Sequence, residues 1–161
     1  MSSNNATGRS LENQIELLLN SQSFSTVDYK DWSKTKPTDG KLLVKHFPYI
    51  SIYETKCRTE FVLIHDGRRI RIECKWQQVS GSVDEKFPYL YLNAVQKWEE
   101  KESILVVDGG GYKPKALEWL KHSAKNKIGF SHKPDKAIAV FTFTEFMIWV
   151  NKGMMDLRQY P

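Results

Sequence analysis

Charged side chains alternate with apolar ones in residues 71–77, RIECKWQ. In a β-strand, successive side chains point to opposite faces, so Glu73, Lys75 and Gln77 would share one face with Arg71. Such a face suits a metal-dependent phosphodiesterase, in which acids hold a divalent cation and an ammonium orients the attacking water. The same residues can also form an ordinary half-exposed strand in which Glu73 and Lys75 are paired.

The partner acid of Glu73 depends on the hairpin that contains this strand. Two strand-like runs flank Asp66 and Gly67, a pair preferred in two-residue type I′ turns. With these residues in the turn, Glu60 lies directly opposite Glu73, on the same face. Asp66 would lie at the turn tip, at the far end of the hairpin. A shift of one residue would move Glu60 to the core face, so this prediction depends on the Asp-Gly turn.

The two faces of the predicted hairpin differ in character. The core face carries Phe61, Leu63, Ile70, Ile72, Cys74 and Trp76. The mixed face carries Glu60, Val62, Ile64, Arg69, Arg71, Glu73 and Lys75. Opposed like charges destabilise a hairpin unless a divalent cation, or the positive charge of Lys75 or Arg71, compensates them. Arg69 and Arg71 lie on the site face and are predicted to contact nucleic acid.

Composition indicates a globular chain of one domain. It has 161 residues, 40% of them hydrophobic and 27% charged, with a formal charge of +5 that weakly favours a polyanionic partner. Its two cysteines show neither metal spacing nor a disulfide framework, which favours a reducing, cytoplasmic location. No apolar run reaches the roughly 18 residues of a membrane span.

The first half of the chain predicts one helix and then a β-meander. We expect residues 1–7 to be loose and a helix over 8–21, with Ser10 as N-cap. We expect a polar surface connection over 21–40 and short strands at 41–46 and 49–53, separated by Pro48.

The second half predicts alternating helices and strands. The expected elements are a helix over 84–100 with Pro88 in its first turn, a strand over 103–108, a turn at the glycines 109–111, a helix over 115–124, a strand over 137–141, and a last helix capped by Thr142 or Thr144. This order predicts an α/β fold with a mixed sheet flanked by helices.

An acid followed on the next strand by Glu-x-Lys resembles the motif of the PD-(D/E)xK nuclease superfamily. The matching residues are Glu60 with Glu73 and Lys75, and Gln77 extends the motif to ExKxQ. The element order is similar over roughly residues 8 to 142. The resemblance implies a restriction-endonuclease-like fold, a mixed central β-sheet flanked by α-helices, in one nuclease domain over residues 1–161.

This chain departs from the family motif at the first acid. Glu60 stands where the family usually has Asp, and Thr59 precedes it rather than Pro. The change keeps the carboxylate chemistry, while Asp66 would be the first acid only in another register.

The resemblance also implies roles for individual residues. Glu60 and Glu73 would bind Mg²⁺, for which Mn²⁺ would substitute, together with the main-chain carbonyl of Cys74. Lys75 would position the attacking water. Many branches place a further acid on the first helix, for which Glu12 is the candidate; its alternative role is that of a solvated helix residue.

Further residues are predicted to assist the site or to contact DNA. Gln77 would anchor the water network or touch the nucleic acid. The segment SGSVDEKFPYLYLNA resembles one found in restriction and phage nucleases. Lys86 in it would contact a phosphate or the site; its alternative role is that of a surface lysine at a helix N-terminus. Lys113 and Lys115 follow the glycines and would approach the DNA backbone. Five more lysines form a loose basic cluster or a solvated surface: Lys121, Lys125, Lys127, Lys133 and Lys136.

Together these features predict a Mg²⁺-dependent DNA endonuclease. Because cutting a duplex requires two sites, a homodimer is expected. The resemblance over 80–95 favours a restriction or phage-borne, homing-type enzyme over a Holliday-junction or repair nuclease. Two other classes stay open: a non-catalytic DNA-binding module on the same fold, and an RNA or nucleotide phosphodiesterase that uses the same metal site.

Overall fold

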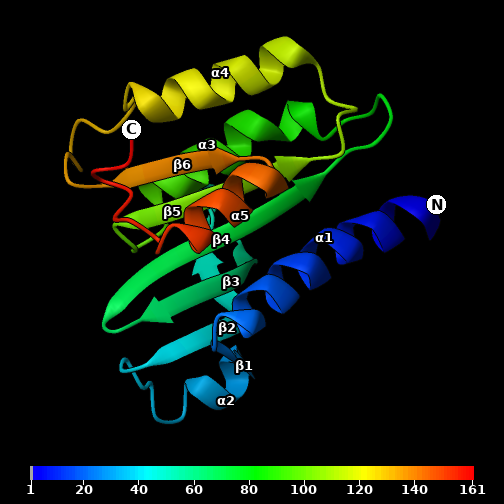
Figure 1. The fold of residues 1–161 in the computed structure, drawn as a ribbon. Helices are drawn as coiled ribbons and strands as arrows, with labels where there is room; N and C mark the ends of the chain where they lie inside the picture. Colours follow the sequence, from blue (N-terminus) through cyan, green and yellow to red (C-terminus); the bar gives the residue numbers. More distant parts are fainter. Residues whose placement is uncertain (1) are drawn as a thin grey trace.

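A six-stranded mixed β-sheet lies between helices in the computed structural model, which describes residues 2–161 and their side chains from Arg9 on (Figure 1). The strands are β1 (Ser25–Asp28), β2 (Lys41–Ile50), β3 (Lys56–His65), β4 (Arg68–Trp76), β5 (Glu102–Asp108) and β6 (Ala137–Phe141). The helices are α1 (Ser2–Ser21), α2 (Tyr29–Trp32), η1 (Asp84–Lys86), α3 (Phe87–Gln96), α4 (Pro114–Lys125) and α5 (Phe143–Asn151). The predicted α/β class, a mixed sheet flanked by helices, is confirmed.

The strands lie in the sheet in the order in which they occur along the chain. Strands β2, β3 and β4 form an antiparallel meander, whereas β1 pairs in parallel with β2. Strands β4, β5 and β6 are parallel, because α3 and α4 carry the chain back across the sheet between them (Figure 1). Strands β4 and β5 therefore end on the same side of the molecule.

Each face of the sheet has its own hydrophobic cluster. Helices α1 and α5 pack on one face, where Leu11, Ile15 and Leu19 of α1 are fully buried. Helices α3 and α4 cover the other face over β5 and β6. The short helix α2 covers β2 and β3, with Trp32 packed among the side chains of a third cluster.

The predicted hairpin is confirmed in turn and register. Asp66 and Gly67 have φ values of 48° and 85°, as a type I′ turn requires, and His65 pairs with Arg68. The core-face side chains pack under α1 and α5 as expected. The other face is more buried than the sequence indicates, because α2 covers Val62 and Ile64.

The polar segment after α1 is more ordered than the predicted surface connection over 21–40. It contains β1 and α2, and the Asp28 carboxylate caps α2 by accepting from the Lys30 N–H at 3.0 Å. Both elements have only four residues, too few for a periodic pattern. Trp32, which is 5% exposed, fixes this segment by tertiary packing.

Pro48 does not separate two strands, which corrects the prediction of two short strands at 41–46 and 49–53. Strand β2 runs through Pro48 to Ile50, and Pro48 pairs with Arg58 of β3. Strand β1 pairs with β2 only as far as Lys45, so the later part of β2 is a free edge, where proline is tolerated.

Two helix boundaries also differ from the predictions. Helix α1 begins at Ser2, so residues 2–7 are helical and Ser10 is not an N-cap. The helix predicted over 84–100 ends at Gln96, because Trp98 and Glu100 turn into the interior.

The remaining predicted elements are confirmed. Pro88 lies in the first turn of α3, while β5, α4 and β6 match their predicted ranges within one residue. Thr142 caps α5 in a capping box with Glu145.

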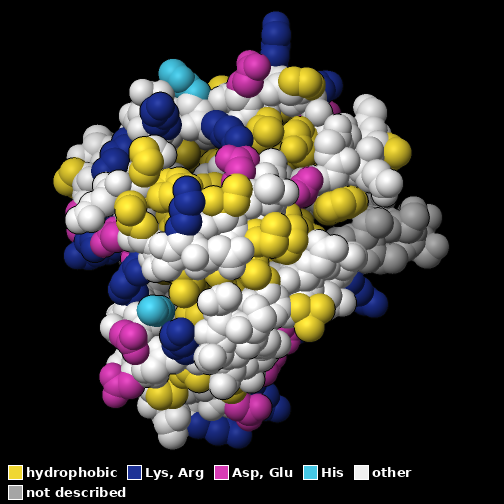
Figure 2. Space-filling model, viewed as in Figure 1, with side chains coloured by type: hydrophobic (Ala, Val, Ile, Leu, Met, Phe, Trp, Pro, Cys, Tyr) yellow, Lys and Arg dark blue, Asp and Glu magenta, His cyan; other side chains and the backbone are white. Residues whose placement is uncertain are grey.

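The surface carries charge of both signs. Figure 2 shows Lys and Arg side chains scattered among Asp and Glu on this face, with hydrophobic side chains gathered over α5 and β6. Among the helices of the described residues, none is both long and apolar enough to cross a membrane.

Candidate active site

The site lies where the β3–β4 ladder opens. The last paired residues are Phe61 and Ile72; beyond them β3 continues beside β2, and β4 beside β5. Glu60 and Glu73 are the first residues past this fork, in the register predicted from the turn. Their like charges would oppose continued pairing, and the opening gives both carboxylates room.

The backbone of β2, which flanks Glu60 on the side away from β4, is irregular as well. Pairing between β2 and β3 passes from Lys45–Phe61 to Phe47–Thr59 and skips His46, which has a φ of 59°. Left-handed backbone is uncommon for residues other than glycine and is concentrated at functional sites. Glu60 therefore lies at an interruption of both ladders.

Helix α1 brings a third carboxylate to the fork. Leu11 and Ile15 fix the buried side of the helix, and one turn beyond Glu12 the Glu16 carboxylate binds Lys45 Nζ of β2 at 3.1 Å. Glu12 thereby lies near Glu60 and Glu73, as predicted for the helix acid. Burial and then the adjacent Glu60 carboxylate, with which it can share a hydrogen bond, raise the pKa of Glu12 to about 7.

Glu73 has one cationic partner. Lys75 Nζ donates to Glu73 Oε1 at 2.8 Å, and Glu73 is only 6% exposed. Burial raises the pKa of Glu73, and Glu60 adds to that effect against Lys75. Burial alone would lower the pKa of Lys75, but Glu73 raises it, so the ammonium stays charged at neutral pH. The carboxylates of the fork thus repel one another, and Lys75 offsets only part of that repulsion.

This repulsion between neighbouring carboxylates is the feature that fits a divalent cation. Glu12, Glu60 and Glu73 offer the hard oxygen ligands that Mg²⁺ and Mn²⁺ accept. Among the side chains described from Arg9 on, no three His, Cys, Asp or Glu residues are already gathered into a metal-binding geometry. The donor types therefore fit the ion, while the carboxylates are not drawn together around a common point.

Cys74 lies between Glu73 and Lys75 in β4, and its side chain faces the opposite side of the sheet. Its side chain is 8% exposed in the core under α1, and burial raises the pKa of its thiol well above the ordinary value. A thiolate nucleophile is therefore excluded, as its predicted face indicated. The metal-binding role of its main-chain carbonyl stays a prediction.

A pocket of about 280 Å³ opens from Glu73 and Lys75 towards α3. Lys86 lines it, so this predicted phosphate contact does lie beside the site. The other lining residues are Tyr49, Cys57, Arg58, Tyr89, Leu90 and Asn93. Arg58 shares a strand face with Glu60, which lies two residues further along β3. Tyr89, Leu90 and Asn93 belong to the segment that resembles one in restriction and phage nucleases, but only the packing of α3 shows that they line the pocket.

Gln77 braces two loops with its side-chain amide. Its Nε2 donates to the Gly111 carbonyl at 3.0 Å, and its Oε1 accepts from the Val83 N–H at 2.6 Å. Both ends of the amide are thus engaged by the backbone, and the side chain is 6% exposed. We therefore assign Gln77 a positioning role instead of the predicted contact with water or nucleic acid.

The three glycines following β5 allow a close approach of two backbones. A Cβ at Gly109 would collide with Gln77, and one at Gly111 would collide with Gln78 and Val79. The Gly111 N–H donates to the Gln77 carbonyl at 2.6 Å. The glycines thus form the turn that the sequence predicted, for a reason only the packing reveals.

Arg71 and Arg69 are occupied by a buried carboxylate. Glu100 accepts from Arg71 Nε at 2.6 Å and from Arg69 Nη2 at 2.9 Å, and Arg71 is 2% exposed. Arg71 also donates to Thr59 Oγ1 at 3.2 Å. This position argues against the predicted nucleic-acid contact of Arg71 and makes that of Arg69 costly, because contact would break its pair with Glu100.

Lys113 and Lys115 are exposed at the start of α4. The main-chain N–H of Lys113 lies 3.4 Å from Asp84 Oδ2, which ties this loop to η1. Neither lysine lines the pocket beside Glu73. Their predicted contact with the DNA backbone would have to occur away from the carboxylates.

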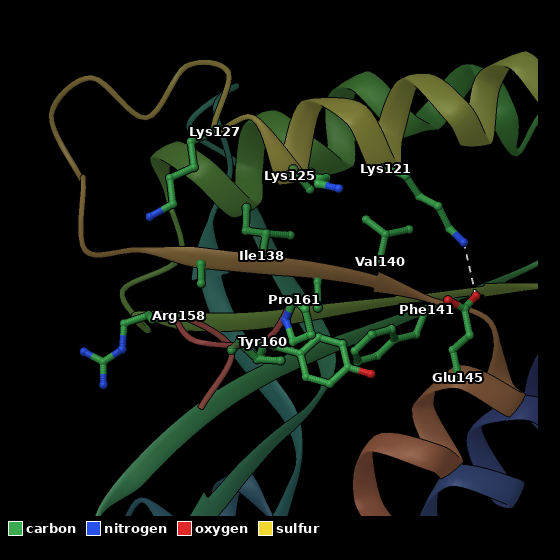
Figure 3. Close-up of a pocket in the computed structure, with 14 residues that line it drawn as sticks. Lys121, Lys125, Lys127, Ile138, Val140, Phe141, Glu145, Arg158, Tyr160 and Pro161 are labelled. Carbon is green, nitrogen blue, oxygen red and sulfur yellow. Dashed lines mark hydrogen bonds and ion pairs between the residues drawn. The ribbon is translucent and has the colours of Figure 1, made fainter. Parts of the chain in front are cut away.

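Most of the basic cluster is engaged in structural contacts. Lys121 Nζ binds Glu145 at 3.1 Å in a pocket of about 350 Å³ beside β6 (Figure 3). Lys127 and Lys133 donate to the main-chain carbonyls of Pro134 and Gln96. Buried Lys136 donates to the Trp98 carbonyl. The pocket beside β6 contains none of the carboxylates Glu12, Glu60 and Glu73, so it is separate from the candidate active site.

Comparison with known proteins agrees with the geometry of the fork. Residues 3–154 match the family model described as the PD-(D/E)XK nuclease superfamily domain. No curated protein and no solved structure matches the chain. The matched range includes Glu12, the hairpin with Glu60, Glu73 and Lys75, and all six strands. The chain therefore belongs to the PD-(D/E)XK nuclease superfamily.

Proposed function

We propose that the protein is a Mg²⁺-dependent DNA endonuclease whose site is the fork between β3 and β4. The observation that carries the proposal is that Glu12, Glu60 and Glu73 lie near one another beside Lys75 and that their charges repel one another. Membership of a nuclease superfamily supports hydrolysis of a phosphodiester. A merely structural ion pair would not need three carboxylates.

In this proposal, Glu60 and Glu73 hold the cation, with Glu12 beside them. When bound, Mg²⁺ would polarise the phosphate and favour ionisation of a nearby water. The water loses a proton to solvent and its oxygen bonds to phosphorus as the bond to the 3′ oxygen breaks, and the leaving 3′ oxygen takes up a proton from solvent. The charged Lys75 ammonium orients the water and stabilises negative charge that develops on the phosphate. Lys86 binds a neighbouring phosphate.

The restriction or phage-borne, homing-type branch is supported by the resemblance over residues 80–95. We propose a homodimer for duplex cleavage, because each chain carries one such fork and a duplex has two strands. A Holliday-junction or repair nuclease is the second candidate, favoured by the exposed Tyr53 ring, which stacks on Tyr89 of the pocket lining.

The test is cleavage of supercoiled and branched DNA by the native chain, Lys75→Ala and Glu73→Ala. With Mg²⁺ or Mn²⁺ we expect nicking or cutting that a chelator abolishes and that each variant lowers by at least about 10²-fold. Lys152→Ala and Glu99→Ala alter exposed residues outside the pocket and serve as matched controls. Circular dichroism verifies folding.

Three results would redirect the proposal. If the native chain binds DNA but cuts no substrate, the chain is a non-catalytic binding module. Cleavage of RNA in preference to DNA would instead favour the RNA phosphodiesterase. If the native chain cuts DNA and Glu73→Ala cuts equally well, the catalytic site lies outside the fork.

A further inference from the structure

Two stacked tyrosines stand at the outer end of the active-site pocket. Tyr53, in the turn between β2 and β3, is 70% exposed. Its ring stacks on that of Tyr89 from α3, with centroids 5.0 Å apart and an angle of 22° between the planes. A large aromatic ring so exposed contributes little to the core, so its stacked arrangement requires another explanation.

The turn that carries Tyr53 is fixed to α3 by a buried amide. Asn93 is 0% exposed; its Oδ1 accepts from the Ile52 N–H at 2.8 Å, and its Nδ2 donates to the Tyr89 carbonyl at 3.0 Å. Within the turn, the Ser51 and Thr55 hydroxyls share a hydrogen bond of 2.7 Å. The main-chain segments that carry the two rings are therefore fixed to each other before any ligand arrives, which lowers the entropic cost of binding.

The tyrosine pair adjoins the chemistry and two exposed cations. Tyr89 lines the same pocket as Glu73 and Lys75. Arg58 and Lys86 line it too, and both residues are exposed. Aromatic faces for bases and cations for phosphates are the two features with which proteins bind single-stranded nucleic acid.

We propose that the Tyr53–Tyr89 pair is a stacking platform for an unpaired DNA base, so that the site takes DNA with single-stranded nucleotides beside the scissile phosphate. In a closed duplex, each base is covered by its stacked neighbours and has no free face for a tyrosine. An unpaired base offers that face to the exposed side of Tyr53, while Arg58 and Lys86 contact its phosphates. The position of the platform relative to the scissile phosphate rests on the proposed nuclease function.

The test measures binding without cleavage, in a Lys75→Ala background with Mg²⁺. One ligand is a closed duplex, and the other is the same duplex with a single-stranded extension that carries a fluorescent adenine analogue quenched by stacking. Adding Tyr53→Ala or Tyr53→Leu is expected to weaken binding of the extended DNA by about 5- to 100-fold and to abolish the quenching. Tyr53→Phe keeps the ring and is expected to retain both.

Matched measurements separate stacking from general weakening. Trp119→Ala removes another exposed aromatic side chain, on α4 outside this pocket, and is expected to change neither ligand's affinity. Binding of the closed duplex is expected to be insensitive to Tyr53. Because Tyr53 is exposed in a turn, its variants are expected to fold, which circular dichroism verifies.

The outcomes distinguish the platform from the nuclease function. Equal loss for both DNAs, no loss for either, no binding of either, or a Tyr53-dependent preference for a single-stranded RNA extension overturns the proposal of a DNA platform. If the native chain cuts DNA independently of Tyr53, the nuclease proposal stands while the platform fails. Tyr53-dependent binding without any cleavage would leave the platform standing as part of a DNA-binding module.

Discussion

Glu73 and Glu100 are both buried carboxylates that face charged side chains of β4, and they differ in how their charge is balanced. Glu100 is held by two guanidiniums, with Arg71 Nε at 2.6 Å and Arg69 Nη2 at 2.9 Å. Burial would raise its pKa, but the Arg71 hydrogen bond and charge lower it below the ordinary value. For Glu73, burial raises the pKa, Lys75 opposes that effect, and the Glu60 carboxylate adds to it, so its pKa stays above the ordinary value.

The difference shows which buried carboxylate has its charge balanced by protein groups alone. Glu100 has more positive than negative charge around it and locks β4 to the segment that follows α3. Glu73 shares one ammonium with two further carboxylates at a point where the ladder has opened. A folded protein tolerates such an imbalance when a ligand corrects it, so perturbed acids in a pocket indicate a functional site.

The largest expected effect is the loss of activity in Glu73→Gln. The amide is nearly the same size but cannot hold a divalent cation as a carboxylate does, so cleavage is expected to fall at least about 10²-fold. Metal-free stability near pH 8 is expected to stay the same or rise, because the buried charge is gone. Thermal melting with cleavage assays measures both, and Glu99→Gln is the exposed control. A strongly destabilised Glu73→Gln would place Glu73 with Glu100, as a structural acid.

Arg71→Met is expected to lower the stability of the fold, unlike Glu73→Gln. It leaves Glu100 buried with Arg69 alone, which is expected to cost about 3–5 kcal/mol of unfolding free energy. The double variant Arg71→Met/Glu100→Leu is expected to recover part of that loss, because no buried charge is left unpaired. Urea denaturation of the single and double variants measures the difference. A cost under about 1 kcal/mol for Arg71→Met would show that the pair behaves like a surface salt bridge.

The smallest expected effect concerns the pH dependence of metal-free stability. The pKa of Glu12 is raised from 4.5 to about 7, so protonation of Glu12 stabilises the folded chain at low pH. This contribution is complete below about pH 4.5 and is lost as the pH rises through about 7. Glu12→Gln is therefore expected to melt at or above the native temperature near pH 8 and to match the native chain at low pH.

Mg²⁺ is expected to narrow that difference near pH 8 by raising the melting temperature of the native chain more than that of Glu12→Gln. Glu16→Gln, which alters the neighbouring turn of α1, is the matched control and is expected to keep the Mg²⁺ response. An identical pH profile in the native chain and Glu12→Gln would mean that Glu12 is an ordinary solvated residue.

Local patterns were sufficient to predict the hairpin, because the Asp-Gly turn and alternation of side chains are short-range properties. They located Glu60, Glu73 and Lys75 on one face and identified Glu12 by analogy with the family. They could not predict the fate of Arg71, because Glu100 lies 29 residues further along the chain. The sequence likewise predicts that Gln77 contacts water or nucleic acid, because its actual partner, the Gly111 carbonyl, is also distant along the chain.

The sequence by itself determined the turn, the register and the chemical types that meet at the fork, since each follows from local geometry and residue type. Tertiary structure alone decided where the ladder opens, which acids are balanced, and that Tyr53 and Tyr89 stack beside the pocket. Those properties depend on contacts between segments far apart in the chain. Burial and charge balance belong to such contacts, so the distinction between Glu73 and Glu100 exists only in the folded protein.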